Sequence, residues 1–263
     1  GRDEMALPQY MNVGVHQCTG SAIVPIDIPV SAEYAFTLAV NGNPFVSIVC
    51  SGSDLERLAL GYLAAEGIIR SAGEVRSIDV DEGAFSIDVR TVEDDDLLER
   101  LFRIRSIASG CGQSAATAGG GMPRRADLPR VRASVITACM KEFLHSSEIH
   151  RLTHGVHSAA LYSVEGERLC FFDEIGRHNA IDKIHGYALE KGLGLERAMI
   201  LSTGRLASEI VQKAIAVSAP ALVSRAAPTT RSIELARGAG MLMIGGVRPS
   251  GFYVFSGEGC VEC

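Results

Sequence analysis

The feature that most constrains the fold is the alternation of apolar runs and amphipathic segments over the second half of this chain. The apolar runs fall near 158–164, 169–172, 198–202, 221–225, 241–247 and 252–255, and the amphipathic segments at 134–145, 177–190, 207–217 and 230–237. Strands that alternate with helices of this length favour a mainly parallel sheet covered by helices. Ligands of such sheets bind where the strands end, at their carboxyl termini. We therefore expect an α/β fold with a site at that edge.

The first half predicts a smaller α+β region that begins with a hairpin. Apolar residues on both sides of Asn41-Gly42 predict two strands within 36–50, because this dipeptide favours a tight hairpin turn. A second hairpin is expected at 75–89, around Asp81-Glu82-Gly83.

A helix is expected between the two hairpins, over 54–66. Ser53 and Glu56 have the spacing of a capping box, and Gly67 suits the residue that ends the helix. The acidic residues 93–96 suit the first turn of a further short helix that reaches about residue 102.

Composition excludes several classes of protein. With 263 residues, 47% of them hydrophobic, the chain has ample material for a large core. A net charge of −6 gives no support for wrapping nucleic acid or binding an anionic membrane. No apolar segment is long enough to span a bilayer, and residues 1–5 lack a signal-peptide pattern. Seven scattered cysteines, an odd number, favour free thiols in a reducing compartment.

Residues 106–129 interrupt the pattern because they are small, rich in glycine and aperiodic. We interpret them as a mobile loop that separates an N-terminal α+β region at 1–105 from an α/β domain at 130–263. Cys111 lies among Gly and Ser in this loop, so it is predicted to be an exposed, reactive thiol rather than a packing residue. Ser114 stands where a Cys-x-x-Cys pair would have its second thiol.

The other cysteines divide into two groups. Four are expected to be small buried hydrophobes, namely Cys18, Cys50, Cys139 and Cys170. Cys260 and Cys263 have Cys-x-x-Cys spacing, which suits half a zinc site or a reversible disulfide. A frayed tail with two incidental thiols is an equal alternative.

Three strand-to-helix corners carry polar groups suited to an anion. They are Arg177-His178-Asn179, Ser202-Thr203-Gly204-Arg205 and the segment 224–231. Free backbone N–H groups, hydroxyls and an Arg are the parts of an anion site, although Ser and Thr also simply cap helices. No standard nucleotide-binding fingerprint is present. The side chains expected to line a pocket at these corners are Arg177, His178, Asn179, Arg205 and Thr229.

Two further groups leave alternatives open. His150, His154 and His157 lie close together in sequence; metal binding is conceivable, capping or surface roles are commoner, and His157 suits a pocket wall. Asp173 and Glu174 suit a paired acid/base site, or more simply they fix Arg177 and His178.

The chain resembles the formate dehydrogenase accessory sulfurtransferase family, the FdhD/NarQ type, from about residue 36 to 256. Asp173–Lys183 resembles the most distinctive motif of that family. Val40–Phe45 followed by Leu58–Ile69 resembles its N-terminal signature. The segments 202–213 and 226–229 are similar to its later blocks.

The resemblance implies a cytidine-deaminase-like α/β domain and a cytoplasmic homodimer. It implies that Cys111 carries persulfide sulfur from a cysteine desulfurase to the molybdenum bis(molybdopterin guanine dinucleotide) cofactor, bound as substrate, for the formate dehydrogenase catalytic subunit. The segment assigned to cofactor binding is Gly246, Val247, Arg248, Pro249, Ser250 and Gly251.

The chain departs from the family pattern at Ser114, which replaces a second loop cysteine, and at Gly246, where an aromatic is common. It also lacks the H-x-E and P-C-x-x-C ligands of zinc deaminases, so no zinc is expected. The alternative function is a non-catalytic chaperone that binds the molybdenum cofactor, with Cys111 incidental. A third reading is a redox or metal-binding protein that uses Cys260 and Cys263.

Overall fold

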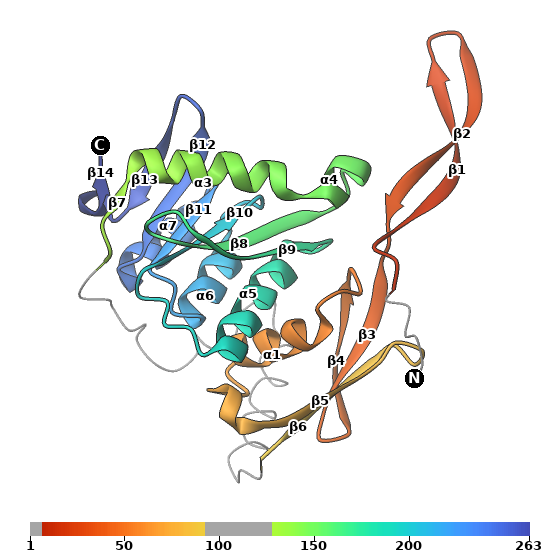
Figure 1. Cartoon of the computed structure of the whole chain (residues 1–263), viewed down its shortest axis with the longest axis horizontal. Helices are drawn as coiled ribbons and strands as arrows, with labels where there is room; N and C mark the ends of the chain where they lie inside the picture. Colours follow the sequence, from red (N-terminus) through yellow and green to blue (C-terminus); the bar gives the residue numbers. More distant parts are fainter. Residues whose placement is uncertain (1–6, 93–127) are drawn as a thin grey trace.

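A six-stranded sheet forms the centre of the chain, for which a computed structural model describes residues 7–92 and 128–263 (Figure 1). Its strand order is β13-β12-β11-β10-β8-β9. The strands are β8 (His157–Ser163), β9 (Arg168–Glu174), β10 (Ala198–Ser202), β11 (Ala221–Ser224), β12 (Leu242–Arg248) and β13 (Gly251–Ser256). The expected α/β fold is confirmed, and the implied likeness to cytidine deaminases stays a prediction.

The expectation of a mainly parallel sheet is wrong. Only β10–β11 and β11–β12 are parallel pairs, whereas β8–β9, β10–β8 and β12–β13 are antiparallel. The reason lies in the connections, because β8–β9 and β12–β13 are joined by short turns, and a hairpin reverses the chain. Strands joined through a helix run parallel, and here these form only the middle of the sheet.

Helices cover both faces of this sheet. On one face lie α5 (Arg177–Lys191), α6 (Ser208–Ala216) and α7 (Thr230–Ala239), and on the other α3 (Ala133–Ser146), which continues into α4 (Glu148–Thr153). Alternate residues of each strand belong to different cores, so that Leu161 packs beneath α5 while Tyr162 packs beneath α3. Burial on both faces explains why the strands are apolar throughout.

The N-terminal region contains a second sheet, of strand order β4-β3-β6-β5. Its elements are β3 (Tyr34–Val40), β4 (Asn43–Cys50), α1 (Leu55–Ala65), the short η1 (Ala72–Glu74), β5 (Val75–Asp81) and β6 (Ser86–Thr91). Both predicted hairpins are confirmed, and Asn41 and Gly42 have the positive φ values of 51° and 76° that the tight turn requires.

The helix expected over 54–66 is confirmed as α1, but only the residue expected to end it is borne out as a cap. After α1, Gly67 has φ 73°, and the N–H groups of Gly67 and Ile68 donate to Ala64 O and Leu63 O, which is a Schellman motif. The expected capping box is wrong, because Asp54 precedes the helix in a left-handed conformation without a side-chain cap.

The two regions meet where α1 crosses α5. A Cβ atom added to Gly61 would lie 1.8 Å from Asp182 O, and one added to Gly186 would lie 2.0 Å from Arg57 O. The helix backbones are therefore in direct contact, which only glycine at both positions permits. The proposed division at 1–105, 106–129 and 130–263 stays a prediction, because residues 93–127 lie outside the described part, as does the short helix expected at 93–102.

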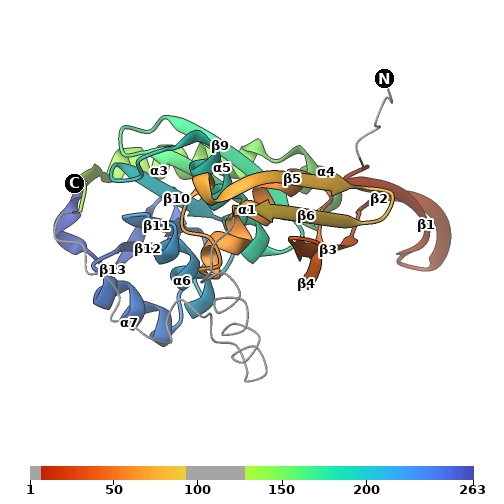
Figure 2. The same cartoon turned by 90° about the horizontal axis from the view of Figure 1, so that it is seen from below.

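Several elements were not anticipated. A long hairpin of β1 (Tyr10–Thr19) and β2 (Ala22–Ser31) extends away from both sheets (Figures 1 and 2). Cys18 lies on this hairpin and is exposed, so its expected burial is wrong. The short strands β7 (Val131–Arg132) and β14 (Val261–Glu262) pair in parallel, and η3 (Glu258–Cys260) precedes β14. Within residues 7–92 and 128–263, no helix is long and apolar enough to cross a lipid bilayer.

Candidate functional site

The polar corners expected at one edge of the sheet do meet there. The parallel strands β10, β11 and β12 end at the same edge, where Ser202 pairs in register with Ser224 and with Ala159 at the start of β8. Glu174, the last residue of β9, lies opposite His157. The chain therefore gathers the segments after four strands, and the one before β8, around one edge.

A cavity of about 550 Å³ opens at this edge, on the side of the sheet that α3 and α4 cover. It is lined by Phe143, Leu144, Ser147, His150, His154, Gly155, Val156, His157, Ser158, Ile175, Thr203, Arg225, Ala226 and Arg248. Two arginines and three histidines are among these lining residues, and none of them is acidic. A pocket of this composition suits an anionic ligand.

The arginines enter the cavity from the ends of β11 and β12. Arg248 Nη1 donates to Arg225 O and to Val247 O, each at 2.8 Å, so the guanidinium is held against the backbone. A guanidinium fixed in this way keeps further donors for a ligand, since it has five N–H groups.

The histidines come from α4 and the start of β8. Ser147 caps α4 by accepting from His150 N at 2.8 Å, and His154 ends the helix in a left-handed conformation. The rings of His150 and His154 meet edge to face at 5.4 Å. His154 thus has the capping role considered above, and both rings also line the cavity. The residues that the structure describes include no group of three or more side chains able to hold a metal ion.

His157 lies deeper, with Nδ1 3.3 Å from Thr203 Oγ1. Burial lowers the pKa of His157, and the nearby Arg177 and His150 add to the effect. The imidazole is therefore neutral at neutral pH, and binding of an anion would favour its protonation.

Asp173 holds two residues of the cavity wall in place through hydrogen bonds. Its carboxylate accepts from Ser158 Oγ at 2.6 Å and from Ser147 Oγ at 2.8 Å, and burial raises its pKa. One carboxylate therefore fixes both the start of α4 and the start of β8, which carry the histidines.

The predicted residues at the start of α5 do not line this cavity. His178 Nε2 lies 2.9 Å from Glu209 Oε2 on α6, and burial lowers the pKa of His178. Asn179 Nδ2 donates to Val49 O at 2.8 Å. The Arg177 side chain packs against Gly204, and its Nε is buried without a partner among the described residues.

Of the remaining predicted residues, some are exposed and others line a cavity. Arg205 and Thr229 are exposed, and Thr229 caps α7 in a capping box with Ser232. In the segment from Gly246 to Gly251, Arg248 lines the cavity, and Val247, Arg248 and Pro249 line an adjoining cavity of about 350 Å³ beside α3. The two cavities share Leu144 and Arg248. Ligand-binding roles for all of these residues stay predictions.

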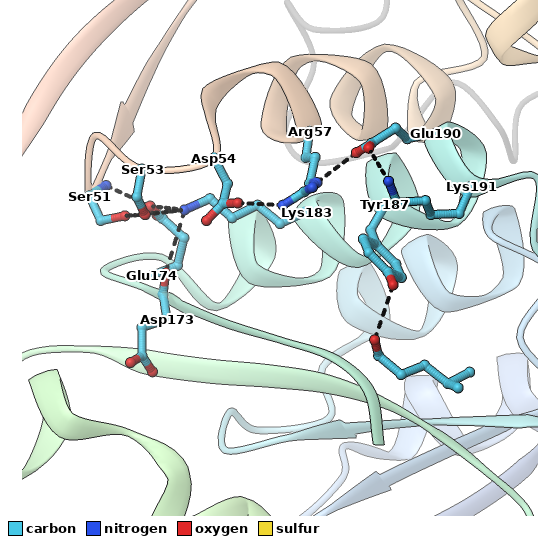
Figure 3. A network of polar contacts seen from close by, with 11 residues as sticks. Ser51, Ser53, Asp54, Arg57, Asp173, Glu174, Lys183, Tyr187, Glu190 and Lys191 are labelled. Carbon is cyan, nitrogen blue, oxygen red and sulfur yellow. Dashed lines mark hydrogen bonds and ion pairs between the residues drawn. The ribbon is translucent and has the colours of Figure 1, made fainter. Parts of the chain in front are cut away.

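The acidic part of the distinctive motif forms a buried network instead (Figure 3). Glu174 and Lys183 are both 0% exposed, with Oε1 and Nζ 3.3 Å apart. Glu174 also accepts from Ser51 N at 2.5 Å, and Lys183 Nζ donates to Ser51 Oγ and Ser53 Oγ at 3.2 Å. The pair thereby ties the β4–α1 loop to the α5 corner.

A second buried pair continues along α5. Lys213 Nζ on α6 lies 2.6 and 2.8 Å from the two oxygens of Asp182, which is 1% exposed. In the described part of the chain, the carboxylates of Asp173 and Glu174 contact serines, Asn179 and Lys183 rather than Arg177 and His178. The motif therefore holds helices and strands together.

None of the cysteines within residues 7–92 and 128–263 lines the cavity. Burial raises the pKa of Cys50 and of Cys139 to about 11, which leaves both thiols unreactive. Cys260 is half-buried and Cys263 exposed, and both are free. Cys111 lies outside the described residues.

The sequence left capping, surface and metal-binding roles open for the three histidines and favoured a pocket wall for His157, which does line the cavity. That His150 and His154 line it as well could not be predicted, because the sequence does not tell which way α4 turns them.

The fold and the cavity define an α/β protein with a cationic pocket at its strand ends. A family model described as the FdhD/NarQ family matches residues 31–262, and this chain belongs to that family.

Named relatives and a solved structure agree with this assignment. The chain is 31% identical to the sulfur carrier protein FdhD of Shouchella clausii over 240 residues, 89% of this chain and 90% of the relative. It is 32% identical to the sulfur carrier protein FdhD of Bacillus subtilis, over 85% and 87% of the two chains. The fold matches the crystal structure of a protein from Desulfotalea psychrophila described as a formate dehydrogenase accessory protein, with a TM-score of 0.81, 24% identity, and coverage of 97% and 100%.

Proposed function

We propose that this chain is a sulfur carrier that serves the maturation of formate dehydrogenase. Family membership and the names of the relatives support this role. In detail, the chain takes persulfide sulfur from a cysteine desulfurase. It passes that sulfur to the molybdenum bis(molybdopterin guanine dinucleotide) cofactor before the catalytic subunit of formate dehydrogenase receives the cofactor. It acts in the cytoplasm as a homodimer.

The observation that carries this proposal is the cationic cavity. The cofactor is a large anion with several phosphates, and Arg225, Arg248 and the three histidines offer donors without a competing carboxylate. The adjoining cavity beside α3 gives room for a further part of the same ligand. Arg225 and His157 thus join the predicted Arg248 as residues that bind the substrate.

Cys111 is the proposed acceptor of the sulfur. Its thiolate attacks the outer sulfur of the desulfurase persulfide, whose S–S bond breaks, and the desulfurase cysteine leaves as a thiolate. The outer sulfur ends on Cys111 as a new persulfide, with no net oxidation or reduction. Ser114 in place of a second loop cysteine means that a single thiol must do this.

The sulfur step is tested by the intact mass of the protein after incubation with a cysteine desulfurase and L-cysteine. We expect one reducible sulfur atom on the wild type and none on Cys111→Ala, with Cys18→Ala, which removes an exposed thiol of the β1–β2 hairpin, as the matched control. Sulfur that persists on Cys111→Ala would move the chemistry to Cys260 and Cys263. No sulfur on either protein would favour the non-catalytic chaperone.

The pocket is tested by titration with GDP, which carries the guanine and phosphates of the cofactor. We expect Arg225→Ala/Arg248→Ala to weaken binding by roughly 10- to 100-fold, because each guanidinium supplies a charge-assisted hydrogen bond. Arg231→Ala is the control, since Arg231 pairs with Glu234 on the surface of α7. Equal affinity in the double variant and the control would contradict the assignment of the cavity.

A further inference from the structure

The short strand β14 has a cysteine at each end. Cys260 directly precedes β14, and Cys263 directly follows it. The strand pairs in parallel with β7, and Val261 lies opposite Val131 in the register. We call this pair of strands the β7–β14 clasp. A ladder of only two residues on each strand is among the weakest in a fold, so the clasp can open without unfolding the rest of the chain.

The two thiols cannot bond to each other while β14 is formed. Val261 has φ −100° and ψ 125°, and Glu262 continues the strand, so both residues between the cysteines are extended. At about 3.3 Å per residue, the Cα atoms of Cys260 and Cys263 are roughly 10 Å apart. A disulfide requires Cα atoms within about 7 Å of each other. A bond between these cysteines therefore requires that the strand be lost.

The surroundings of the two thiols differ. Cys260 is half-buried and packs against the core beneath α3, which includes Val131 at 2% exposure. Cys263 is exposed. A soluble oxidant thus reaches Cys263 first, whereas Cys260 is partly shielded until β14 moves.

The clasp holds the beginning of α3. This helix follows β7 with no residue between them. The turn before β14 packs at the same place, since a Cβ atom added to Gly257 would lie 3.3 Å from the Leu128 side chain. Further along, α3 carries Phe143 and Leu144 of the cavity wall. Opening of the clasp would uncover the apolar base of a helix that reaches the candidate site.

We propose that Cys260 and Cys263 form a redox site whose disulfide opens the β7–β14 clasp. The Cys263 thiolate attacks glutathione disulfide, whose S–S bond breaks, and one glutathione leaves as a thiolate. Once β14 detaches, the Cys260 thiolate attacks Sγ of Cys263, and the second glutathione leaves. Two cysteine thiols are oxidised to one disulfide, glutathione disulfide is reduced to two glutathione molecules, and the leaving thiolates take up the two protons.

The strand and the disulfide exclude each other, so each disfavours the other. Because β14 stabilises the reduced form, the disulfide is easier to reduce in this fold than in a chain that lacks the strand. A disulfide that is readily reduced suits reversible regulation in a reducing compartment rather than permanent cross-linking. This inference goes beyond the proposed sulfur transfer and does not depend on it.

The test combines peptide mass mapping with hydrogen exchange after incubation in excess glutathione disulfide, without desulfurase or L-cysteine. In the wild type we expect a disulfide between Cys260 and Cys263. We also expect the amide hydrogens of β7 and β14 to exchange at least 10-fold faster than in the reduced protein. Cys260→Ser is the matched control, because it can form only a mixed disulfide at Cys263 and should keep the exchange rates of the reduced wild type.

Val261→Gly tests whether the strand limits oxidation, since glycine weakens a strand. We expect its disulfide to form at least 5-fold faster than that of the wild type. Val24→Gly makes the same substitution in the exposed strand β2 and should leave the rate unchanged.

Three results would overturn the proposal. They are an oxidised protein whose β7 amides keep their protection, equal rates in the wild type and Val261→Gly, and the absence of a bond between Cys260 and Cys263, including the case in which either one bonds to Cys111. Failure of Cys111 to take up sulfur from a desulfurase would count against the proposed function alone.

Discussion

Two polar segments meet at the same edge of the sheet, and they differ in role: one forms a buried network and the other lines the cavity. The corner after β9 carries the richer motif, yet Glu174, Asp182 and Lys183 are buried and pair with neighbouring elements. The plainer segment at 147–158 turns His150, His154 and His157 into the cavity. Polar residue type alone does not distinguish a binding group from a scaffold; burial and partners do.

The physical reason is the cost of burying charge. An ion pair at 0% exposure is tolerated only when further hydrogen bonds satisfy both groups, and Ser51, Ser53 and Asn179 do this here. Such a network fixes the position of whole elements. Histidines at a cavity wall keep their ring nitrogens accessible and can change protonation.

Breaking the buried pair should give the largest effect on stability. Lys183→Met leaves the Glu174 carboxylate buried without its counter-charge, and we expect a loss of about 3–5 kcal/mol in the free energy of unfolding by urea. Lys191→Met is the matched control, because Lys191 pairs with Glu190 at the exposed end of the same helix. This exposed pair is expected to contribute at most about 1 kcal/mol. Equal losses in the two variants would mean that the motif is not a scaffold.

Disrupting the contact between α1 and α5 should give the next largest loss of stability. Gly186→Ala places a methyl group 2.0 Å from the backbone oxygen of Arg57, so the helices must separate, at a cost of about 3 kcal/mol in unfolding free energy. Gly238→Ala in α7 meets nothing within 4 Å and is expected to stabilise by about 0.5–1 kcal/mol. A Gly186→Ala protein as stable as wild type would show that the two regions are not packed this closely.

Substitution of His157 should give the smallest effect. We expect it in the affinity for GDP rather than in the free energy of unfolding. Because the folded pKa of His157 lies below its usual value, the ring is neutral at pH 7 and gains a proton as pH falls. Affinity for GDP should therefore rise toward pH 5.5 in the wild type. His157→Gln should lack this rise in affinity. It should bind GDP roughly 5-fold more weakly than the wild type at pH 5.5, with little difference at pH 8.

The control for this titration is His16→Gln on the exposed β1–β2 hairpin, which leaves all three pocket histidines in place. If both variants keep the pH dependence of the wild type, His157 does not face the bound anion. If Lys183→Met instead abolishes GDP binding without loss of stability, the roles of the two segments are reversed.

Much of the fold was predictable where the signal is local. Asn41-Gly42 predicted a hairpin because the turn needs two positive φ values, and Gly67 predicted the end of α1 for the same reason. The β1–β2 hairpin was missed, although Met11, Val13 and Val15 alternate with polar or small residues, which is a strand pattern. The hairpin lies outside both cores, so Cys18 was expected to be buried but is exposed.

The candidate site was predictable only in its position. The order of strands and helices placed polar corners at one edge, and the structure brings those corners together. Which face of the sheet holds the cavity depends on where α3 and α4 pack. Arg248 therefore lines the cavity, whereas His178 and Thr229 are occupied with Glu209 and with capping α7.

Local patterns in the chain specify the α/β class, the positions of most elements, the sheet edge where the polar segments gather and membership in the FdhD/NarQ family. These follow from local periodicity, turn chemistry and motif order. The tertiary structure decided the antiparallel flanks, the α1–α5 contact, the buried pairs and the direction of each polar side chain. Those features depend on contacts between residues far apart in the chain, where burial decides whether a charge binds a ligand or a neighbouring helix.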